Sequence, residues 1–367
     1  MRIAYILNTL ETGGAERQVL ALAEQMRSRG HAVRMLVLRA HAAHHLQTPL
    51  DVVYLRMRRD PFRAALGFAR AVRLLREFCP DVVHGNQFHG NMLARLLHVA
   101  MPSVPVISAI HNVYEGGRVR MLAYRVSDRL SARNVAVCAA AAERFAAICA
   151  ASQKRMQVIV NGIDVTAFSP DATRRQRMRA ELEAGDNFVW LAACRIAPAK
   201  DIPNLLRAFA IVRKSEPRAQ LWIAGEGRTS YVRALQRLGS ELDIAPAVRW
   251  LGLRSDVAAL LDAADGFVLS SAWEGMPLAL AEAMAMAKPL VATDVGGVRE
   301  LAGECVSLIS PQDSGALAGA MLTTMRMNTA KRSDAGSQAR RRVEEHFNLN
   351  TNALQWERCY METAPRG

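Results

Sequence analysis

The sequence predicts an α/β protein made of two doubly wound domains, each with a parallel sheet covered by helices on both faces. Short apolar runs rich in β-branched residues alternate with amphipathic segments along the chain, and this alternation restarts at residue 187. The length of 367 residues, of which 51% are hydrophobic, suits two domains that each have a core.

The first series of strands and helices fills residues 1–168. Its predicted strands are 2–8, 32–38, 52–57, 81–86, 104–112, 134–139 and 156–162. Two helices are well delimited between them. One covers residues 15–30 and ends on Gly30, and the other covers residues 61–78 and opens with a proline, which the first helical turn tolerates.

The second series fills residues 169–346, after a polar linker that contains Gly and Pro at 161–175. Its predicted strands are 187–196, 219–227, 247–253, 266–272, 289–294 and 305–310. Residues 347–367 follow a complete series and contain a further helix at 349–363. This helix could pack on either domain, including back on the first.

Several observations favour a cytoplasmic protein. No run reaches the roughly 18 apolar residues of a membrane span, and the N-terminus is typical of a first strand and not of a signal peptide. Six scattered cysteines include no C-x-x-C pair, so neither a zinc site nor a disulfide framework is indicated.

The net charge of +13 is concentrated in the first domain. Residues 1–168 hold 22 Arg and Lys against 11 Asp and Glu, a net +11. This imbalance predicts an anionic partner: a phosphate-bearing substrate, an anionic membrane surface or, on charge alone, nucleic acid. An arginine-rich solvated surface is the simpler alternative. The helix at 61–78 carries four arginines beside five large apolar residues and could lie at a membrane interface or pack normally.

Ligands of doubly wound sheets bind beyond the carboxyl ends of the strands, so the turns that follow strands are the candidate sites. Gly13 and Gly14 stand where the first strand leads into a helix, and the N-terminus of a helix favours an anion. The dinucleotide fingerprint G-x-G-x-x-G is missing, and residues 225–230 match it only in part. Arg195 and Lys200 follow the first strand of the second domain and could hold a pyrophosphate.

Two glutamates, Glu274 and Glu282, flank an otherwise apolar segment. Glu274 follows the strand at 266–272, Pro277 suits the start of a helix, and Glu282 lies inside that helix. Carboxylates accept hydroxyl hydrogen bonds, so two of them beside the helix start suit a sugar nucleotide. The alternative, a loop charge and a solvent-facing helix residue, conflicts with the apolar surroundings.

His84 and His111 end two strands of the first domain, and each could be structural or functional. His111 could lie in the cleft that faces the second domain. Residues 41–45 ("HAAHH") could in principle bind a metal but lack nearby Cys or acidic ligands.

These residues resemble the retaining glycosyltransferases of family 4, which have the GT-B fold and act in bacterial polysaccharide or lipopolysaccharide synthesis. The shared motifs are "GGAERQ" (13–18), "NGID" (161–164), "RIAPAK" (195–200) and the E-x7-E segment "EGMPLALAE" (274–282). Each is weak alone, but four in this order over nearly the whole chain are specific.

The resemblance implies a role for each matching position. Glu282 would hold the ribose hydroxyls and Glu274 the hydroxyls of the transferred sugar. The diphosphate would lie against Arg195 and Lys200, with Gly14 and the helix start at Pro277, Leu278 and Ala279. His111 would lie near the sugar. No metal or cofactor is expected, because the cationic side chains supply the charge.

The expected activity is metal-independent transfer of a hexosyl or N-acetylhexosaminyl group from a nucleotide sugar, with UDP favoured over GDP. The acceptor would be a lipid-linked sugar or glycan used for cell-surface polysaccharide, at the inner face of the cell membrane, with no role for nucleic acid. Two alternatives stay open: a nucleotide-sugar 2-epimerase of the same fold, and a non-catalytic binding protein.

Overall fold

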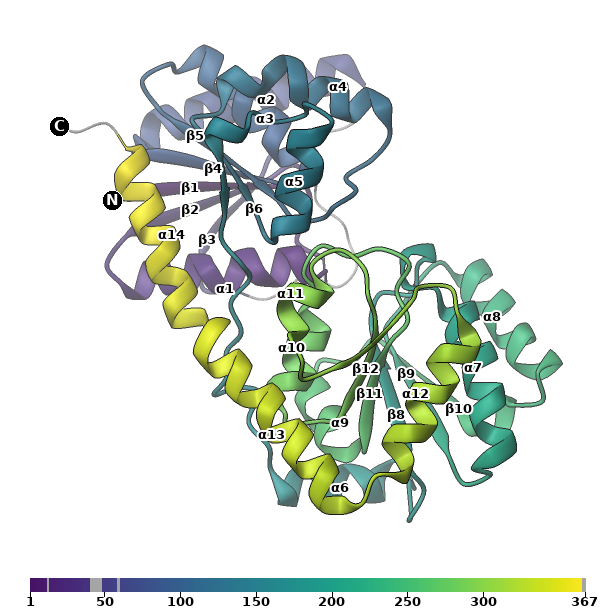
Figure 1. The fold of residues 1–367 in the computed structure, drawn as a ribbon. Coiled ribbons are helices and arrows are strands. Elements are labelled where there is room, and N and C mark those ends of the chain that lie inside the picture. Colours follow the sequence, from purple (N-terminus) through teal and green to yellow (C-terminus); the bar gives the residue numbers. More distant parts are fainter. Residues whose placement is uncertain (12, 40–47, 58–59, 365–367) are drawn as a thin grey trace. The chain divides into compact units, whose positions relative to one another are not determined.

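The chain folds into two compact units, each built on one parallel sheet with helices on both faces (Figure 1). The computed structural model describes residues 1–11, 13–39, 48–57 and 60–364. Unit 1 comprises Met1–Gly162 and Leu349–Gly367, and unit 2 comprises Ile163–Asn348. The predicted fold class, two doubly wound α/β domains, is confirmed.

The sheet of unit 1 has seven strands in the order β3-β2-β1-β4-β5-β6-β7. They are β1 (Arg2–Leu7), β2 (Ala32–Val37), β3 (Asp51–Tyr54), β4 (Val82–Asn86), β5 (Val106–Ile110), β6 (Arg133–Ala136) and β7 (Met156–Val158). Each overlaps a strand predicted from the sequence. The central strand β1 pairs with β2 on one side and β4 on the other, so the direction of winding reverses between β1 and β4.

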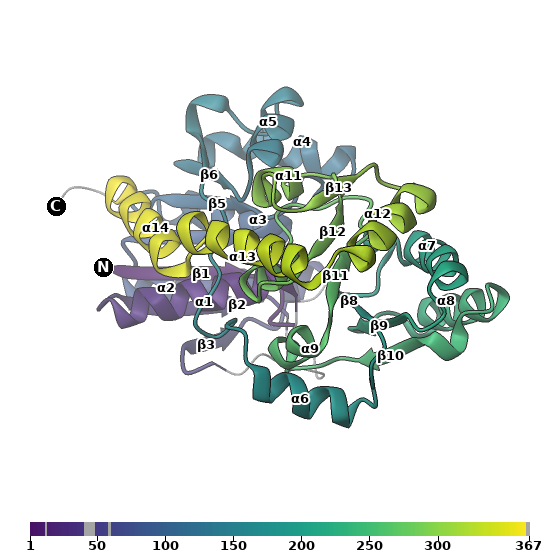
Figure 2. The ribbon, with the colours of Figure 1, turned by 60° about the horizontal axis from the view of Figure 1, so that its bottom comes forward.

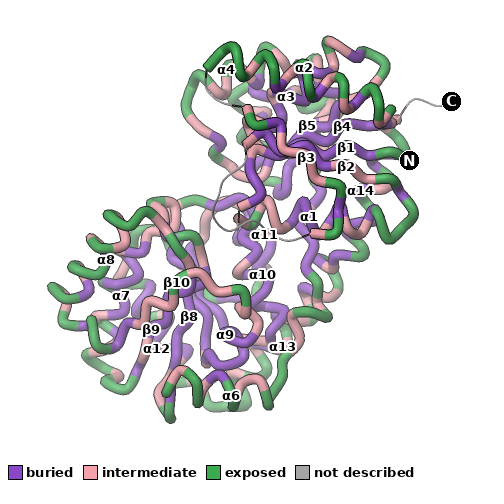
Figure 3. Tube along the Cα trace, turned by 180° about the vertical axis from the view of Figure 1, so that it is seen from behind, coloured by how far each residue is buried: buried purple, intermediate pink, exposed green. Residues whose placement is uncertain are grey.

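Helices cover both faces of this sheet. They are α1 (Gly14–Ser28), α2 (Pro61–Phe78), α3 (Gln87–Ala100), α4 (Arg118–Ser127), α5 (Ala139–Ala147) and α14 (Leu349–Thr363), with the 3₁₀ turns η1 (Asp128–Leu130) and η2 (Gln153–Arg155). Alternate residues of β1 serve the two faces: Ile3 and Tyr5 pack with α1 and α14, whereas Ala4 and Ile6 pack with α2 and α3. Figure 3 shows the strands buried and the outer helix faces exposed.

The helix α14 returns to unit 1 after the chain has completed unit 2, and it lies beside α1 (Figure 2). The Tyr360 hydroxyl is 2.7 Å from His84 Nδ1 and 3.1 Å from the Tyr5 hydroxyl. Trp356 stacks on His84 with ring centroids 4.5 Å apart. His84 is fully enclosed, and burial lowers the pKa of its imidazole well below the usual value. His84 therefore has a structural role.

Unit 2 repeats the plan with six strands in the order β10-β9-β8-β11-β12-β13. The strands are β8 (Val189–Ala193), β9 (Gln220–Ala224), β10 (Val248–Gly252), β11 (Gly266–Leu269), β12 (Leu290–Thr293) and β13 (Ser307–Ile309). The helices are α6 (Ala172–Glu181), α7 (Ile202–Ser215), α8 (Thr229–Glu241), α9 (Val257–Ala263), α10 (Leu278–Ala285), α11 (Val298–Ala302), α12 (Ser314–Arg326) and α13 (Thr329–His346), with η3 (Pro198–Lys200) and η4 (Ala245–Ala247). Here the winding reverses between β8 and β11.

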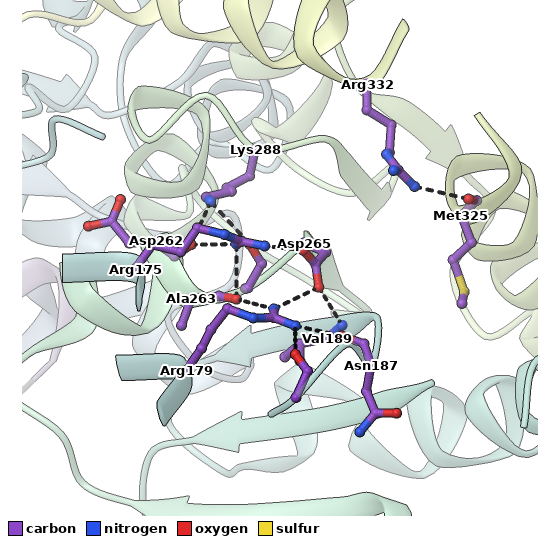
Figure 4. A network of polar contacts seen from close by, with 12 residues as sticks. Arg175, Arg179, Asn187, Val189, Asp262, Ala263, Asp265, Lys288, Met325 and Arg332 are labelled. Atoms are coloured by element: carbon purple, nitrogen blue, oxygen red, sulfur yellow. Dashed lines mark hydrogen bonds and ion pairs between the residues drawn. The ribbon is translucent and has the colours of Figure 1, made fainter. Parts of the chain in front are cut away.

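The helix α6 begins inside the predicted linker and is held to unit 2 by charged contacts (Figure 4). Arg175 and Lys288 both donate to the main-chain oxygens of Asp262 and Ala264, at the C-terminus of α9, where cations are favoured. Asp265 accepts from Arg175 and from Arg179. Only the earlier part of the predicted linker is therefore irregular.

Candidate functional site

Each unit has a pocket at the carboxyl edge of its sheet, beside the two strands where the winding reverses. In unit 1 this shallow pocket is lined by Leu7, Ala15, Glu16, Val19, Asn86 and Gln87. In unit 2 it is lined by the ends of β8 and β11 together with Lys200 and Ile202. Doubly wound sheets bind ligands at such positions, so both pockets lie where the fold predicts a site.

Beside the pocket of unit 2, Lys200 forms an ion pair with the buried carboxylate of Glu274. Lys200 Nζ lies 2.5 Å from Glu274 Oε1, and the Ser271 hydroxyl donates to the same oxygen at 2.6 Å. Glu274 is only 6% exposed. A carboxylate this enclosed needs a cation and hydrogen bonds to remain charged, and it has both. The structure thus brings together two of the predicted site residues.

The backbone around Lys200 is held from the neighbouring strand end. Lys200 closes η3, and Asp201 adopts a left-handed conformation with φ 42° before capping α7. The Ser270 hydroxyl donates to the main-chain oxygen of Lys200 at 2.8 Å, and Ala272 N–H donates to Ala199 at 2.8 Å. These bonds tie the turn after β8 to the loop after β11, which fixes the position of the lysine.

The helix α10 carries the other predicted residues of this segment. Pro277 is the N-cap residue, one position before the first helical residue, Leu278, and Ala279 follows in the first turn. Glu282 lies further along α10 and is 3% exposed. Neither glutamate of the E-x7-E segment is therefore a solvent-facing charge, as the apolar surroundings predicted.

A glycine turn after β12, which the sequence analysis did not single out, supports the loop of Glu274. Gly297 N–H donates to the main-chain oxygen of Gly275 at 2.8 Å. A Cβ at Gly296 would lie 2.0 Å from the main-chain oxygen of Glu274, and φ there is +55°. Only glycine fits this approach.

Arg195 lies just beyond β8 and is exposed, unlike Lys200. The glycines of the partial fingerprint pack against this segment, because a Cβ at Gly225 would lie 1.8 Å from the main-chain oxygen of Cys194. Ile196 N–H donates to the main-chain oxygen of Glu226 at 2.7 Å. Gly225 and Gly227 thus permit contact between two backbone segments.

In unit 1 the Gly13–Gly14 turn lies where β1 leads into α1, as predicted. Gly13 is the N-cap residue and Gly14 the first helical residue. The next two residues, Ala15 and Glu16, line the pocket. The predicted turn therefore lies at the rim of the pocket of unit 1.

His111 directly follows β5 and is held by two side chains. Its Nε2 lies 3.0 Å from Asn86 Oδ1, and its main-chain N–H donates to Glu115 Oε1 at 3.0 Å. Burial lowers the pKa of the imidazole to about 4. Asn86 also lines the pocket, so the geometry connects His111 with it.

Glu115 and Tyr124 are site neighbours that the sequence analysis did not identify. The Tyr124 hydroxyl donates to Glu115 Oε2 at 2.5 Å. Burial raises the pKa of the Glu115 carboxyl to about 7, although both hydrogen bonds act against this rise. A carboxylate four residues after a strand-end histidine was a signal that could have been followed.

Within the described ranges, the structure contains no group of three His, Cys, Asp or Glu side chains placed to hold a metal ion. The predicted "HAAHH" segment at 41–45 lies outside the described residues. All six cysteines are free thiols. Among the helices that the structure describes, none is both long and apolar enough to cross a membrane.

Comparison with known proteins identifies both units. Residues 12–167 match the model of Glycosyltransferase Family 4, and residues 187–327 match that of Glycosyl transferases group 1. The chain is 24% identical over 318 residues to alpha-monoglucosyldiacylglycerol synthase of Streptococcus pneumoniae, which covers 80% of this chain and 71% of that protein. It is 28% identical over 313 residues to the MMP alpha-(1->4)-mannosyltransferase of Mycolicibacterium hassiacum, covering 78% and 71%.

The solved structures agree with this result at the level of the fold. The crystal structure of Anabaena HepE in complex with UDP and glucose superposes with a TM-score of 0.88 at 22% identity, over 98% of this chain and 99% of that one. The two sheets therefore form the GT-B architecture, and the two family domains follow one another in its order. The chain belongs to the GT-B glycosyltransferases, with a family 4 domain followed by a group 1 domain.

Proposed function

We propose that this glycosyltransferase moves a sugar from a nucleotide-sugar donor to a hydroxyl of a lipid-linked or glycan acceptor, with retention of configuration and without a metal ion. The observation that carries the proposal is the Lys200–Glu274 pair beside the pocket of the group 1 domain. A cation and a buried carboxylate side by side suit a ligand that joins a diphosphate to a polyol.

Each site residue receives one task in this proposal. Lys200 and Arg195 neutralise the diphosphate, together with the N-terminus of α10 at Pro277, Leu278 and Ala279 and the Gly13–Gly14 turn. Glu274 accepts hydrogen bonds from hydroxyls of the transferred sugar, and Glu282 from the ribose. His111 contacts the sugar. Because the cations and helix termini supply positive charge, the leaving group needs no bound metal.

The chemical step breaks the bond between the anomeric carbon and the diphosphate oxygen and forms a bond from that carbon to the acceptor oxygen on the same face. The acceptor proton passes to an oxygen of the departing diphosphate. The negative charge that develops on the diphosphate is greatest in the transition state, so Lys200 and Arg195 lower the barrier by preorganised electrostatics.

A UDP-sugar is favoured over a GDP-sugar as the donor. HepE was crystallised with UDP and glucose, and this fold similarity supports the choice of UDP as a first probe. The test is a thermal-shift panel of UDP- and GDP-sugars, because a ligand that binds only the folded chain raises its melting temperature. The best ligand is then given to the enzyme with candidate acceptors, with and without EDTA. Activity that EDTA abolishes and Mg²⁺ restores would contradict metal independence, and a product of inverted anomeric configuration would contradict retention.

A nucleotide-sugar 2-epimerase remains the enzymatic alternative. It would convert UDP-N-acetylglucosamine without an acceptor, and NMR of that incubation distinguishes the two activities. Conversion of the donor in the absence of an acceptor would favour the epimerase. A donor that stays unchanged without an acceptor and is consumed when an acceptor is added supports transfer. Binding of a sugar nucleotide with neither reaction would indicate a non-catalytic protein.

The proposal of a lipid-linked acceptor is supported by exposed residues on the helices of unit 1, where α3 packs against both α2 and α4. α4 exposes Val119 at 82%, Leu122 at 58% and Val126 at 73%, which lie along one side of the helix. Phe62 and Leu66 of α2 are exposed as well, and seven exposed arginines accompany these residues: Arg63, Arg70, Arg73, Arg76, Arg118, Arg125 and Arg129. Apolar side chains among cations suit the surface of an anionic membrane, where a cell-surface polysaccharide acceptor would be anchored.

The proposed association of unit 1 with an anionic membrane is tested by flotation with phosphatidylcholine vesicles, with and without phosphatidylglycerol. We expect binding only to the anionic vesicles, and the triple change of Val119, Leu122 and Val126 to Ser should abolish it. Leu354→Ser, at an exposed apolar position on α14, is the matched control and should bind normally. Absence of binding by the unchanged protein would refute the peripheral membrane role and leave the transfer reaction untouched.

A further inference from the structure

The amide of Asn86 has its orientation set by two carbonyl groups. Asn86 is buried at the end of β4, and its Nδ2 donates to the main-chain oxygens of His84 at 3.2 Å and Ile6 at 3.4 Å. The reverse orientation would place Oδ1 against those two oxygens. Oδ1 therefore faces His111, and it can only accept a hydrogen bond.

This orientation decides which nitrogen of His111 carries the proton. Nε2 of His111 lies 3.0 Å from Asn86 Oδ1, so Nε2 must be the N–H donor. The ring is neutral at physiological pH, because burial lowers its pKa to about 4. A neutral imidazole has one N–H, so Nδ1 holds a lone pair.

That lone pair has no partner in the described part of the chain. Nδ1 of His111 is buried and makes no hydrogen bond there, although the ring is held at Nε2 and the backbone at Glu115. Buried polar atoms are nearly always satisfied, so an orphaned acceptor on an otherwise fixed ring points to a ligand that supplies the donor. Nε2 of His84 is also buried without a hydrogen bond, but that ring is 1% exposed and covered by Trp356 and Tyr360, whereas His111 is only half-buried.

We infer that Asn86 is a positioning residue that holds His111 as the Nε2–H tautomer, so that Nδ1 accepts a hydrogen bond from a hydroxyl of the bound sugar. The tautomer follows from the geometry of unit 1 alone. The identity of the donor as a sugar hydroxyl rests on the proposed function. Asn86 pairs in register with Ala109, two residues before His111 on the adjacent strand, so the sheet itself sets the distance between the amide and the ring.

The tautomer is measured in the ligand-free full-length protein by long-range ¹H–¹⁵N correlation with ¹⁵N-labelled histidine. The His111 signals are assigned by their loss in His111→Gln. We expect the Nε2–H form in the unchanged protein and a mixture of tautomers in Asn86→Ala. Asn134→Ala removes another buried asparagine of unit 1, bonded to Arg95 and Asp128, and should leave the His111 tautomer unchanged. An Nδ1–H form in the unchanged protein, or an unchanged tautomer in Asn86→Ala, would overturn the inference whatever the enzyme transfers.

Kinetics then test the role toward the sugar. Asn86→Ala should lower kcat about tenfold, the equivalent of about 1.4 kcal/mol. Asn86→Asp keeps an acceptor at Nε2, but its carboxylate favours the imidazolium and raises the pKa of His111. Its rate should therefore fall at low pH, where Nδ1 is protonated, and recover toward the unchanged rate by about pH 8. A rate for Asn86→Asp that falls equally at every pH would assign Asn86 a merely structural role and refute the link to the sugar.

Discussion

At the scale of single residues, the pair of Lys200 and Glu274 is one functional element. Lys200 and Ser271 both donate to the same carboxylate oxygen of Glu274. Removing the charge of Lys200 or of Glu274 therefore leaves the other residue of the pair without its charged partner. The roles that the sequence assigned to them separately, diphosphate for the lysine and sugar for the glutamate, are therefore coupled.

We predict that Lys200→Met and Glu274→Gln each lower kcat/KM about 10²- to 10³-fold, the usual effect of losing an electrostatic group from a site. The double variant should lose no more than the worse single variant, because each change already breaks the pair. The measurement is a double-mutant cycle of steady-state transfer rates. The exposed pair Arg326–Glu216 on the same unit is the control, and its cycle should leave activity unchanged. If the fold-loss in kcat/KM of the double variant equalled the product of the two single fold-losses, Lys200 and Glu274 would act independently.

Glu115 makes stability depend on pH. The folded state raises the pKa of this carboxyl from 4.5 to about 7, so the folded chain binds a proton that the unfolded chain releases. The stabilisation that Glu115 adds to the free energy of unfolding is fully present below about pH 4.5 and is lost as the pH rises through about 7. Glu115→Gln removes this dependence. Relative to that variant, the unchanged protein should lose up to about 3 kcal/mol of unfolding free energy between pH 4.5 and pH 7. Urea unfolding across this range measures it, and a constant difference would contradict the raised pKa.

At the scale of the elements, the position of Glu274 depends on the glycine turn after β12. A Cβ at Gly296 would clash with the main-chain oxygen of Glu274, and the backbone of Gly296 is in the left-handed region, which disfavours any residue with a Cβ. We expect Gly296→Ala to lower transfer by at least tenfold, because a displaced loop misplaces the carboxylate. Gly252 also has a positive φ, of 65°, but no atom within 4 Å of its Cβ position. Gly252→Ala should therefore lose stability and keep its activity, and equal activity in both variants would show that the turn does not position Glu274.

The sequence predicted the elements better than their contacts. Every strand was foreseen, because a parallel strand buried on both faces needs an apolar run. Both bounds of α2 agree with the predicted helix at 61–78, which Pro61 opens. The structure adds Asp60 as the N-cap residue and Cys79, in a left-handed conformation, as the C-cap residue. The Gly296–Gly297 turn was missed because a glycine pair in a loop indicates only a turn, and its partner Glu274 is distant in sequence.

The two strand-end histidines show the same limit within the site. His84 and His111 have similar local sequences, and their difference arises from α14, which covers His84 from the far end of the chain. The residues next to each histidine in the sequence do not predict that contact. The partners of His111 also come from elsewhere, since Asn86 ends a neighbouring strand. Lys200 and Glu274 were found because each lies in the loop that leads from the carboxyl end of a strand into a helix.

At the scale of the whole molecule, both units use the same order of strands around their first strand, and each places a pocket at its own switch point. The units differ in how their chains close. Unit 2 is one continuous segment, whereas unit 1 is completed by α14 after the chain has left it and returned. The stability of unit 1 therefore depends on residues that follow unit 2 in the sequence.

This dependence predicts that damage to α14 is felt in unit 1. Trp356 is buried against His84 in the core cluster that also holds β1 and α1, so Trp356→Ala should destabilise unit 1 by about 3–5 kcal/mol. Amide hydrogen exchange measures the effect by unit: protection should fall in β1 and α1 and remain in β8 and α7. Trp222→Ala, at a fully buried tryptophan of unit 2, should produce the reverse pattern. If Trp356→Ala instead lowered protection equally in both units, the two would unfold as one cooperative system, and α14 would stabilise the entire chain and not the unit that it completes.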